Sequence, residues 1–171
     1  MWFNFIGFQI SWLGLVLWGN LFIPIALLWL TIHFIRLSVV QRRQDAQVIF
    51  LVALLGICFD SALIWIGVFE FNDNIFNSVF IPMWLMVLWC CFAATLTHSL
   101  SFLANLPFLQ IACGAIVAPL SYYAGYQLSA VNFGYSISFT LGILAIYWSV
   151  LMLIFFQIVL FILTKEQTNV T

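Results

Sequence analysis

Long apolar stretches separated by short polar segments run through the whole chain, and this pattern predicts a helical membrane protein. About 20 apolar residues in an α-helix cross the roughly 30 Å hydrocarbon core of a bilayer. Inside lipid every backbone polar group has to be paired, which leaves helices or closed barrels. The apolar runs are continuous here, whereas barrel strands alternate apolar with polar residues. We therefore expect an all-α fold, a polytopic transmembrane helical bundle that forms one integral-membrane domain over residues 1–171.

The breaks between the apolar runs divide the chain into six predicted spans. Gly19-Asn20, followed by Pro24, ends the first span and starts the second, because these residues favour a turn and a helix N-terminus. Both spans are short, so a re-entrant pair within the first forty residues remains an alternative. The predicted spans are residues 3–18, 21–37, 46–69, 80–100, 108–127 and 136–163.

The basic residues indicate how the spans are oriented. With six spans, Arg36, Arg42, Arg43 and Lys165 all fall on the same side of the membrane. Cytoplasmic loops carry an excess of Lys and Arg, so this side is predicted to be cytoplasmic, together with both termini. Arg42 and Arg43 then lie in a short cytoplasmic loop before the third span.

Composition excludes several classes of protein. Charged residues make up 5% of the chain, against roughly 25% in soluble domains. A net charge of −1 without a basic patch argues against a nucleic-acid partner. The cysteines lack metal-ligand spacing such as C-x-x-C and are interpreted as small apolar packing residues. These are Cys58, Cys90, Cys91 and Cys113. We expect no metal site and no cofactor.

Asp60 is the outstanding polar residue at membrane depth. A carboxylate at the bilayer centre costs about 2.5–3.5 kcal/mol on insertion scales, so such residues usually face the bundle interior. Ala53, Gly56, Asp60, Leu63 and Gly67 share one face of the predicted helix, and its small residues allow close packing. Asp60 is either a ligand anchor, proton relay or catalytic acid, or a structural hydrogen-bond partner between helices.

A second polar stripe lies on the predicted span 80–100. It contains Trp84, Leu88, Cys91, Thr95, His98 and Ser101. His98 either caps the last carbonyls of its helix or takes part in catalysis or ligand binding. His33 lies at a matching depth, which allows a shared site. Two imidazoles can hold a b-type haem, but no other feature favours iron.

Helical spacing separates His98 from Asp60. At about 1.5 Å per residue, Asp60 lies about 15 Å further towards the outer side than His98. A direct Asp–His dyad would require different span boundaries. A Ser–His–Asp hydrolase built from Ser99 or Ser101 is disfavoured for the same reason.

The predicted fifth span carries a proline at membrane depth. Pro119 breaks the hydrogen-bond ladder near Ala115, and broken helices often flank binding sites, although plain kinks are also common. Tyr122 follows near the outer end, where it can reach the interface or an inner cavity.

The central part of the chain resembles a known family. The pattern consists of Asp60, Pro82, Trp84, Leu88, Trp89, Phe92, Thr95, Leu96, Ser99, Leu100, Pro107, Gly114, Pro119, Tyr122 and Gly125. It is similar to that of a bacterial family of small multi-pass inner-membrane proteins, known only as a domain of unknown function. The resemblance is strongest over Asp60–Leu128, and it departs at Ala118 and Ser129, where glycines are expected. It implies a bacterial inner-membrane location, and it hints at membrane-lipid modification.

Three functions remain open. The favoured one is binding of a membrane lipid or apolar small molecule in an interior pocket. Its predicted ligand-binding residues are Asp60, Trp84, Trp89, Thr95, His98, Ser99 and Tyr122. The second is an intramembrane lipid-modifying enzyme with Asp60 and His98 as catalytic candidates. The third is a membrane scaffold that docks peripheral proteins at the cytoplasmic face through Arg42 and Arg43.

Overall fold

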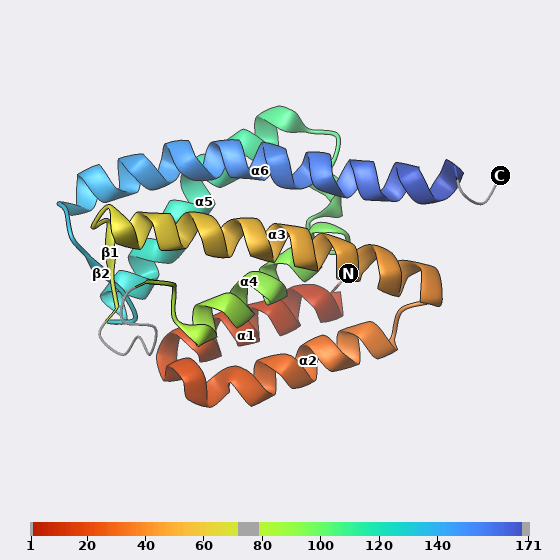
Figure 1. Ribbon diagram of the computed structural model, residues 1–171, viewed down its shortest axis with the longest axis horizontal. Coiled ribbons are helices and arrows are strands. Elements are labelled where there is room, and N and C mark those ends of the chain that lie inside the picture. Colours follow the sequence, from red (N-terminus) through yellow and green to blue (C-terminus); the bar gives the residue numbers. More distant parts are fainter. Residues whose placement is uncertain (1, 72–78, 169–171) are drawn as a thin grey trace.

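The computed structural model describes residues 2–71 and 79–168 and has an all-α architecture in this part of the chain (Figure 1). Six α-helices carry the fold, with two short 3-10 turns and one pair of two-residue strands. The helices are α1 Trp2–Trp18, α2 Ile23–Ile35, α3 Val39–Trp65, α4 Met83–Leu96, α5 Pro107–Gln127 and α6 Ile137–Thr168. The 3-10 turns are η1 Gly19–Phe22 and η2 Ser101–Leu103, and the strands are β1 Phe69–Glu70 and β2 Asn132–Phe133.

Among the described residues, four helical segments are long and apolar enough to cross a membrane. They are Trp2–Ile35, in which α1 and α2 are counted together with the turn between them, then Val39–Trp65, Pro107–Gln127 and Ile137–Lys165. The fifth apolar helix, α4, has only 14 residues, about 21 Å at the usual helical rise. This pattern is that of a multi-pass membrane protein.

Helix α4 is shorter than the predicted span 80–100. It starts directly after Pro82 and ends at Leu96, where the Leu100 N–H donates back to the Thr95 carbonyl across 2.9 Å. That bond closes the helix in the manner of a C-terminal capping turn. His98 and Ser99 therefore lie in the turn after the helix.

Helix α3 begins earlier than predicted, and this corrects the place of the basic residues. Ser38 and Gln41 form a capping box, so the helix starts at Val39 and not at residue 46. Arg42 and Arg43 lie inside α3, not in a loop as predicted. The Arg42 guanidinium donates to the carbonyls of Phe34 and Ile35 at the end of α2, at 2.7 and 3.1 Å.

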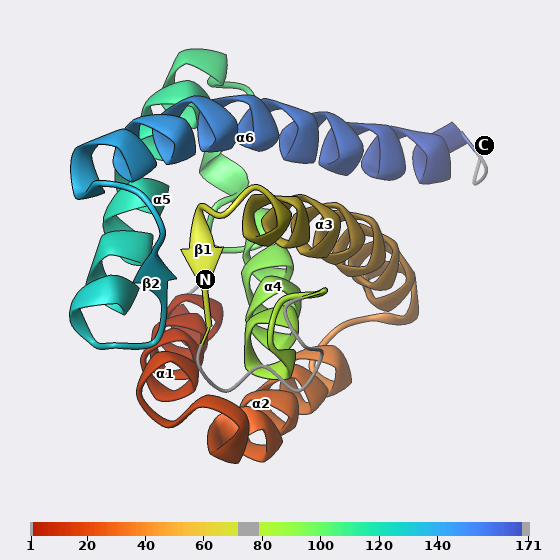
Figure 2. The ribbon, with the colours of Figure 1, turned by 60° about the vertical axis from the view of Figure 1, so that its left-hand side comes forward.

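Helix α4 occupies the middle of the bundle, as Figure 2 shows, with α1 and α2 on one side and α3 and α6 on the other. Helix α5 packs along α6, where Gly114 lies directly against the α6 backbone at Trp148 and leaves no space for a side chain. At the left of Figure 1, β1 pairs antiparallel with β2, with Phe69 opposite Phe133. This pair joins the connection after α3 to the connection before α6.

Candidate functional site

Asp60 is completely buried and accepts three side-chain hydrogen bonds. Trp89 Nε1 of α4 and the Tyr122 hydroxyl of α5 donate to Oδ2 at 2.8 and 2.7 Å. The Tyr147 hydroxyl of α6 donates to Oδ1 at 3.3 Å. The carboxylate of α3 therefore ties together three other helices, and its oxygens are occupied by donors from the protein itself.

Small residues on α3 make this arrangement possible. Gly56 lies one turn before Asp60, and a Cβ there would overlap sterically with the indole ring of Trp89. Ala53, Gly56, Asp60 and Leu63 are all buried, so this predicted interior face is confirmed for the helical residues. Gly67, the fifth residue of that face, lies beyond the helix with a φ of 75°.

Aromatic stacking holds the partners of Asp60 in place. The Trp89 ring stacks on Trp148 of α6 with a centroid distance of 5.1 Å and an interplanar angle of 4°. Tyr122 stacks on Phe69 with the same distance and angle. Both rings are therefore fixed on one side by Asp60 and on the other by an aromatic neighbour.

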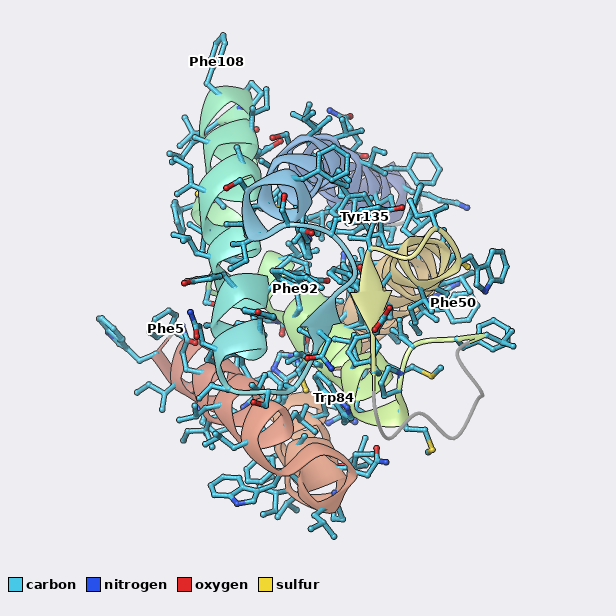
Figure 3. The ribbon with its side chains drawn as sticks, turned by 90° about the vertical axis from the view of Figure 1, so that its left-hand side faces the viewer. Phe5, Phe50, Trp84, Phe92, Phe108 and Tyr135 are labelled. Atoms are coloured by element: carbon cyan, nitrogen blue, oxygen red, sulfur yellow. The ribbon has the colours of Figure 1, made fainter. Side chains whose placement is uncertain are left out.

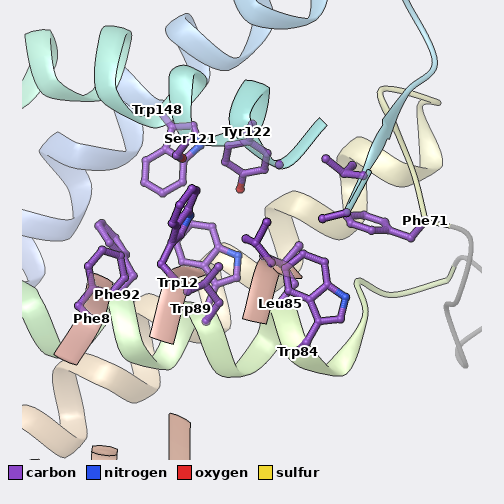
Figure 4. Close-up of a pocket in the computed structure, with 15 residues that line it drawn as sticks. Phe8, Trp12, Phe71, Trp84, Leu85, Trp89, Phe92, Ser121, Tyr122 and Trp148 are labelled. Atoms are coloured by element: carbon purple, nitrogen blue, oxygen red, sulfur yellow. The ribbon is translucent and has the colours of Figure 1, made fainter. Parts of the chain in front are cut away.

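In front of these rings lies an apolar cavity of about 90 Å³, shown in Figure 4. Trp12 of α1, Trp84 and Trp89 of α4, Tyr122 of α5 and Trp148 of α6 contribute to its wall. Asp60 stands behind this wall, since Trp89 and Tyr122 lie between the cavity and its carboxylate. Asp60 therefore positions the wall through its hydrogen bonds.

A larger groove of about 510 Å³ shares part of that wall. It runs between α1 and α5, which face each other at the left of Figure 3. The residues that line both the cavity and the groove are Phe8, Trp12, Phe92, Ser121 and Trp148. The groove adds Thr95, Ser99, Phe102 and several small residues of α5. The two hollows share these five lining residues, and we refer to them together as the lateral groove.

The predicted ligand-binding residues divide into four places. Trp84, Trp89 and Tyr122 line the cavity, and Thr95 and Ser99 line the larger hollow. Asp60 lies behind the wall, and His98 belongs to another cluster. That these residues bind a ligand stays a prediction.

The Ser99 side chain is held by α1. Its hydroxyl donates to Asn4 Oδ1 at 2.6 Å, and Asn4 Nδ2 donates to the Ala94 carbonyl at 2.9 Å. Asn4 is itself buried, with 4% of its surface exposed. This network joins the start of α1 to the end of α4 at the edge of the lateral groove.

A second buried carboxylate on α3, Asp45, was not among the residues predicted from the sequence. Its Oδ2 lies 2.8 Å from His33 Nε2 of α2 and 2.7 Å from His98 Nε2. The Thr97 hydroxyl donates to Oδ1 at 2.8 Å. The predicted common site of His33 and His98 thus has a carboxylate at its centre. The matching depths of His33 and His98 pointed to this place. Asp45 was left outside the predicted third span, because that span was predicted to start at residue 46.

The His98 ring contacts Asp45 through Nε2, at 2.7 Å, so it does not simply cap the end of α4. A role of His98 in catalysis or ligand binding stays a prediction. His98 and Asp60 belong to separate clusters, as their different depths predicted. His33, Asp45 and His98 carry donor atoms that all lie within 4.8 Å of one another, which is the kind of set that can hold a metal ion.

Comparison with known proteins gives a family without an assigned activity. The model of a family described as a protein of unknown function, DUF2878, matches residues 1–154. No curated protein and no solved structure matches the chain. The match includes the region Asp60–Leu128 on which the sequence resemblance is based and extends it to the first helices.

Proposed function

We propose that this chain, which belongs to the DUF2878 family of unknown function, is a membrane protein that holds a lipid acyl chain in its lateral groove. The groove itself is the observation that best supports this proposal. Its larger hollow has a volume of about 510 Å³ and is lined mostly by apolar side chains of α1, α4, α5, α6 and the turn after α4. Small-molecule pockets have volumes of roughly 300–1,000 Å³.

The position of the groove favours entry of an acyl chain from the surrounding lipid. It lies between α1 and α5, and the flanks of these helices carry exposed apolar residues such as Ile10, Ile116 and Leu120. In a bilayer such flanks face acyl chains, because burying a charged or polar surface there is costly. An acyl chain can therefore pass from the surrounding lipid into the groove without crossing a polar barrier.

We also propose six crossings, with both termini in the cytoplasm of a bacterium and the protein in its inner membrane. The start of α1, the turn between α2 and α3 and the end of α6 lie towards the right-hand end of Figure 1, away from β1 and β2. Arg36, Arg42 and Arg43 lie at that turn, in agreement with the positive-inside rule. The location in a bacterial inner membrane follows from the sequence resemblance alone.

The lipid-modifying enzyme is a weaker alternative. It required Asp60 and His98 to act together as acid and base, yet Asp60 is bonded to Trp89, Tyr122 and Tyr147, and His98 is bonded to Asp45. General acid–base catalysis needs both groups within hydrogen-bond reach of one substrate. The lateral groove therefore supports binding better than it supports this reaction.

Photolabelling tests lipid occupancy directly. The purified full-length protein in mild detergent is mixed with about one equivalent of a phospholipid that carries a diazirine in its acyl chain. After illumination, the labelled residues are mapped by mass spectrometry. The expected labels are on half-buried groove residues, namely Phe8, Phe92 and Ala118. Labels confined to outward-facing residues such as Ile146 and Phe161, which are 73% and 65% exposed, would contradict the proposal.

A further inference from the structure

We propose that His33, Asp45 and His98 form a binding site for a divalent transition-metal ion of the zinc or iron(II) class. The ligand atoms would be Nε2 of His33, Oδ2 of Asp45 and Nε2 of His98. This inference goes beyond the lipid proposal, because these three side chains lie apart from the wall of the lateral groove. It also revises the expectation from the sequence, which predicted no metal.

The donor atoms converge on one point. Both imidazole nitrogens approach the same carboxylate oxygen, at 2.8 and 2.7 Å. Zinc binds nitrogen and oxygen at about 2.0–2.2 Å, so two ligands of a tetrahedral ion lie about 3.4 Å apart. To admit the ion, the two distances from Oδ2 to the nitrogens would have to lengthen by about 0.6–0.7 Å, and the two nitrogens, which lie within 4.8 Å of each other, would have to lie about 3.4 Å apart.

The surrounding residues orient the ligands. The Thr97 hydroxyl holds Oδ1 and leaves Oδ2 facing the imidazoles. The His33 ring packs between Trp29 and Phe34, with centroid distances of 5.8 and 5.6 Å. The His98 ring stands perpendicular to that of His33 at 4.8 Å. Such outer contacts commonly fix the orientation of metal ligands.

The charge and exposure of the set fit an ion with an open position. Two neutral imidazoles and one carboxylate offer a single negative charge, and they leave room for water or an anionic ligand as a fourth partner. The side chains of His33 and Asp45 are 4% and 3% exposed, whereas that of His98 is 23% exposed. The free position therefore lies on the His98 side. Three protein ligands with an open position are typical of reactive metal sites, and two histidines with one carboxylate also bind iron(II).

Metal titration tests the site in the full-length protein. The protein is purified with a tag that contains no histidine, treated with a chelator and titrated with Zn²⁺ by calorimetry, and the bound metal is counted by elemental mass spectrometry. We expect one equivalent per chain. Asp45→Asn and His98→Ala should each weaken binding by about 10–100-fold or more, since even changes to residues that only hydrogen-bond to a metal ligand have effects of this size.

Asp60→Asn is the matched control. It makes the same change, on the same helix, at another buried carboxylate, and it should leave the affinity for Zn²⁺ unchanged. A parallel anaerobic titration with Fe²⁺ distinguishes the two metals, and tighter binding of either ion at one equivalent supports the site.

X-ray absorption of the zinc-loaded wild-type protein keeps the test decisive if the variants fail to fold. The spectrum should show imidazole nitrogen and oxygen ligands without sulfur, which excludes binding by the free thiols such as Cys58. Three results would overturn the proposal: no stoichiometric metal in the wild type, unchanged affinity in a folded Asp45→Asn variant, or sulfur in the ligand shell. In each case the cluster is a hydrogen-bonded structural network only.

Discussion

Asp45 and Asp60 are two buried carboxylates on the same helix, and their neighbours give them different chemistry. Asp60 is surrounded by one indole and two phenols, which only donate hydrogen bonds to it. Asp45 is surrounded by two imidazoles and one hydroxyl. Indole and phenol partners fix a structure, whereas imidazoles can exchange protons or bind metals.

Burial alone does not identify a reactive group. Asp60 is the more deeply buried of the two, at 0% against 3% exposed, and it drew attention in the sequence for that reason. Its oxygens are engaged by donors from three helices, so its role is to hold the wall of the lateral groove. Asp45 lies beside His98, whose side chain is 23% exposed, whereas that of His33 is 4% exposed.

Replacing each carboxylate with leucine should give the largest difference in stability between the two regions. Asp60→Leu leaves the donors of Trp89, Tyr122 and Tyr147 unpaired in the interior, at about 1–3 kcal/mol for each group that finds no new partner. The free energy of unfolding should fall by about 3 kcal/mol or more. Equilibrium unfolding in mixed detergent micelles, measured with a chelator present, provides the value.

Asp45→Leu is the matched change and should lower stability less, by about 1–3 kcal/mol, because only the buried Nε2 of His33 is left without a partner. His98 is accessible to water, and the Thr97 hydroxyl can bond to a carbonyl of its own preceding turn instead. Equal losses of stability in the two variants would show that the clusters play the same structural role.

A smaller effect is expected at Gly56, which lets Trp89 reach Asp60. In Gly56→Ala the new methyl group overlaps the indole ring, so stability should fall by about 1–3 kcal/mol through overpacking. Gly142→Ala on α6 is the control, since a Cβ there meets nothing within 4 Å, and it should be neutral or stabilising by up to about 1 kcal/mol. Similar results for both variants would mean that the fit of Trp89 against α3 is unimportant.

Much of the architecture could be predicted from the sequence because it depends on local pattern. The continuous apolar runs give the all-α fold, and the Gly19-Asn20 break gives the turn between α1 and α2, where Gly19 has a φ of 53°. The spacing of Ala53, Gly56 and Asp60 identifies the interior face of α3. Each of these signals lies within a few residues along the chain.

The site was less predictable because its contacts link distant positions. Asp45 bonds to residues 12, 52 and 53 positions away, and helical periodicity carries no information about such pairs. The polar, charged segment around Arg42 and Arg43 also resembles a loop, although the capping box of Ser38 and Gln41 was a local signal for an earlier helix start. Asn4 was missed because it stands in an otherwise apolar run.

Lipid retention by two tryptophan variants tests directly whether a lipid occupies the lateral groove. Ala118 lines the groove, whereas Ala112 is an exposed residue of the same helix, so Ala118→Trp fills the groove and Ala112→Trp does not. Native mass spectrometry after identical purification counts the bound lipid. We predict one retained lipid in the wild type and in Ala112→Trp, and loss of most of it in Ala118→Trp. Equal lipid retention by the two variants would contradict the proposal that the lateral groove holds a lipid.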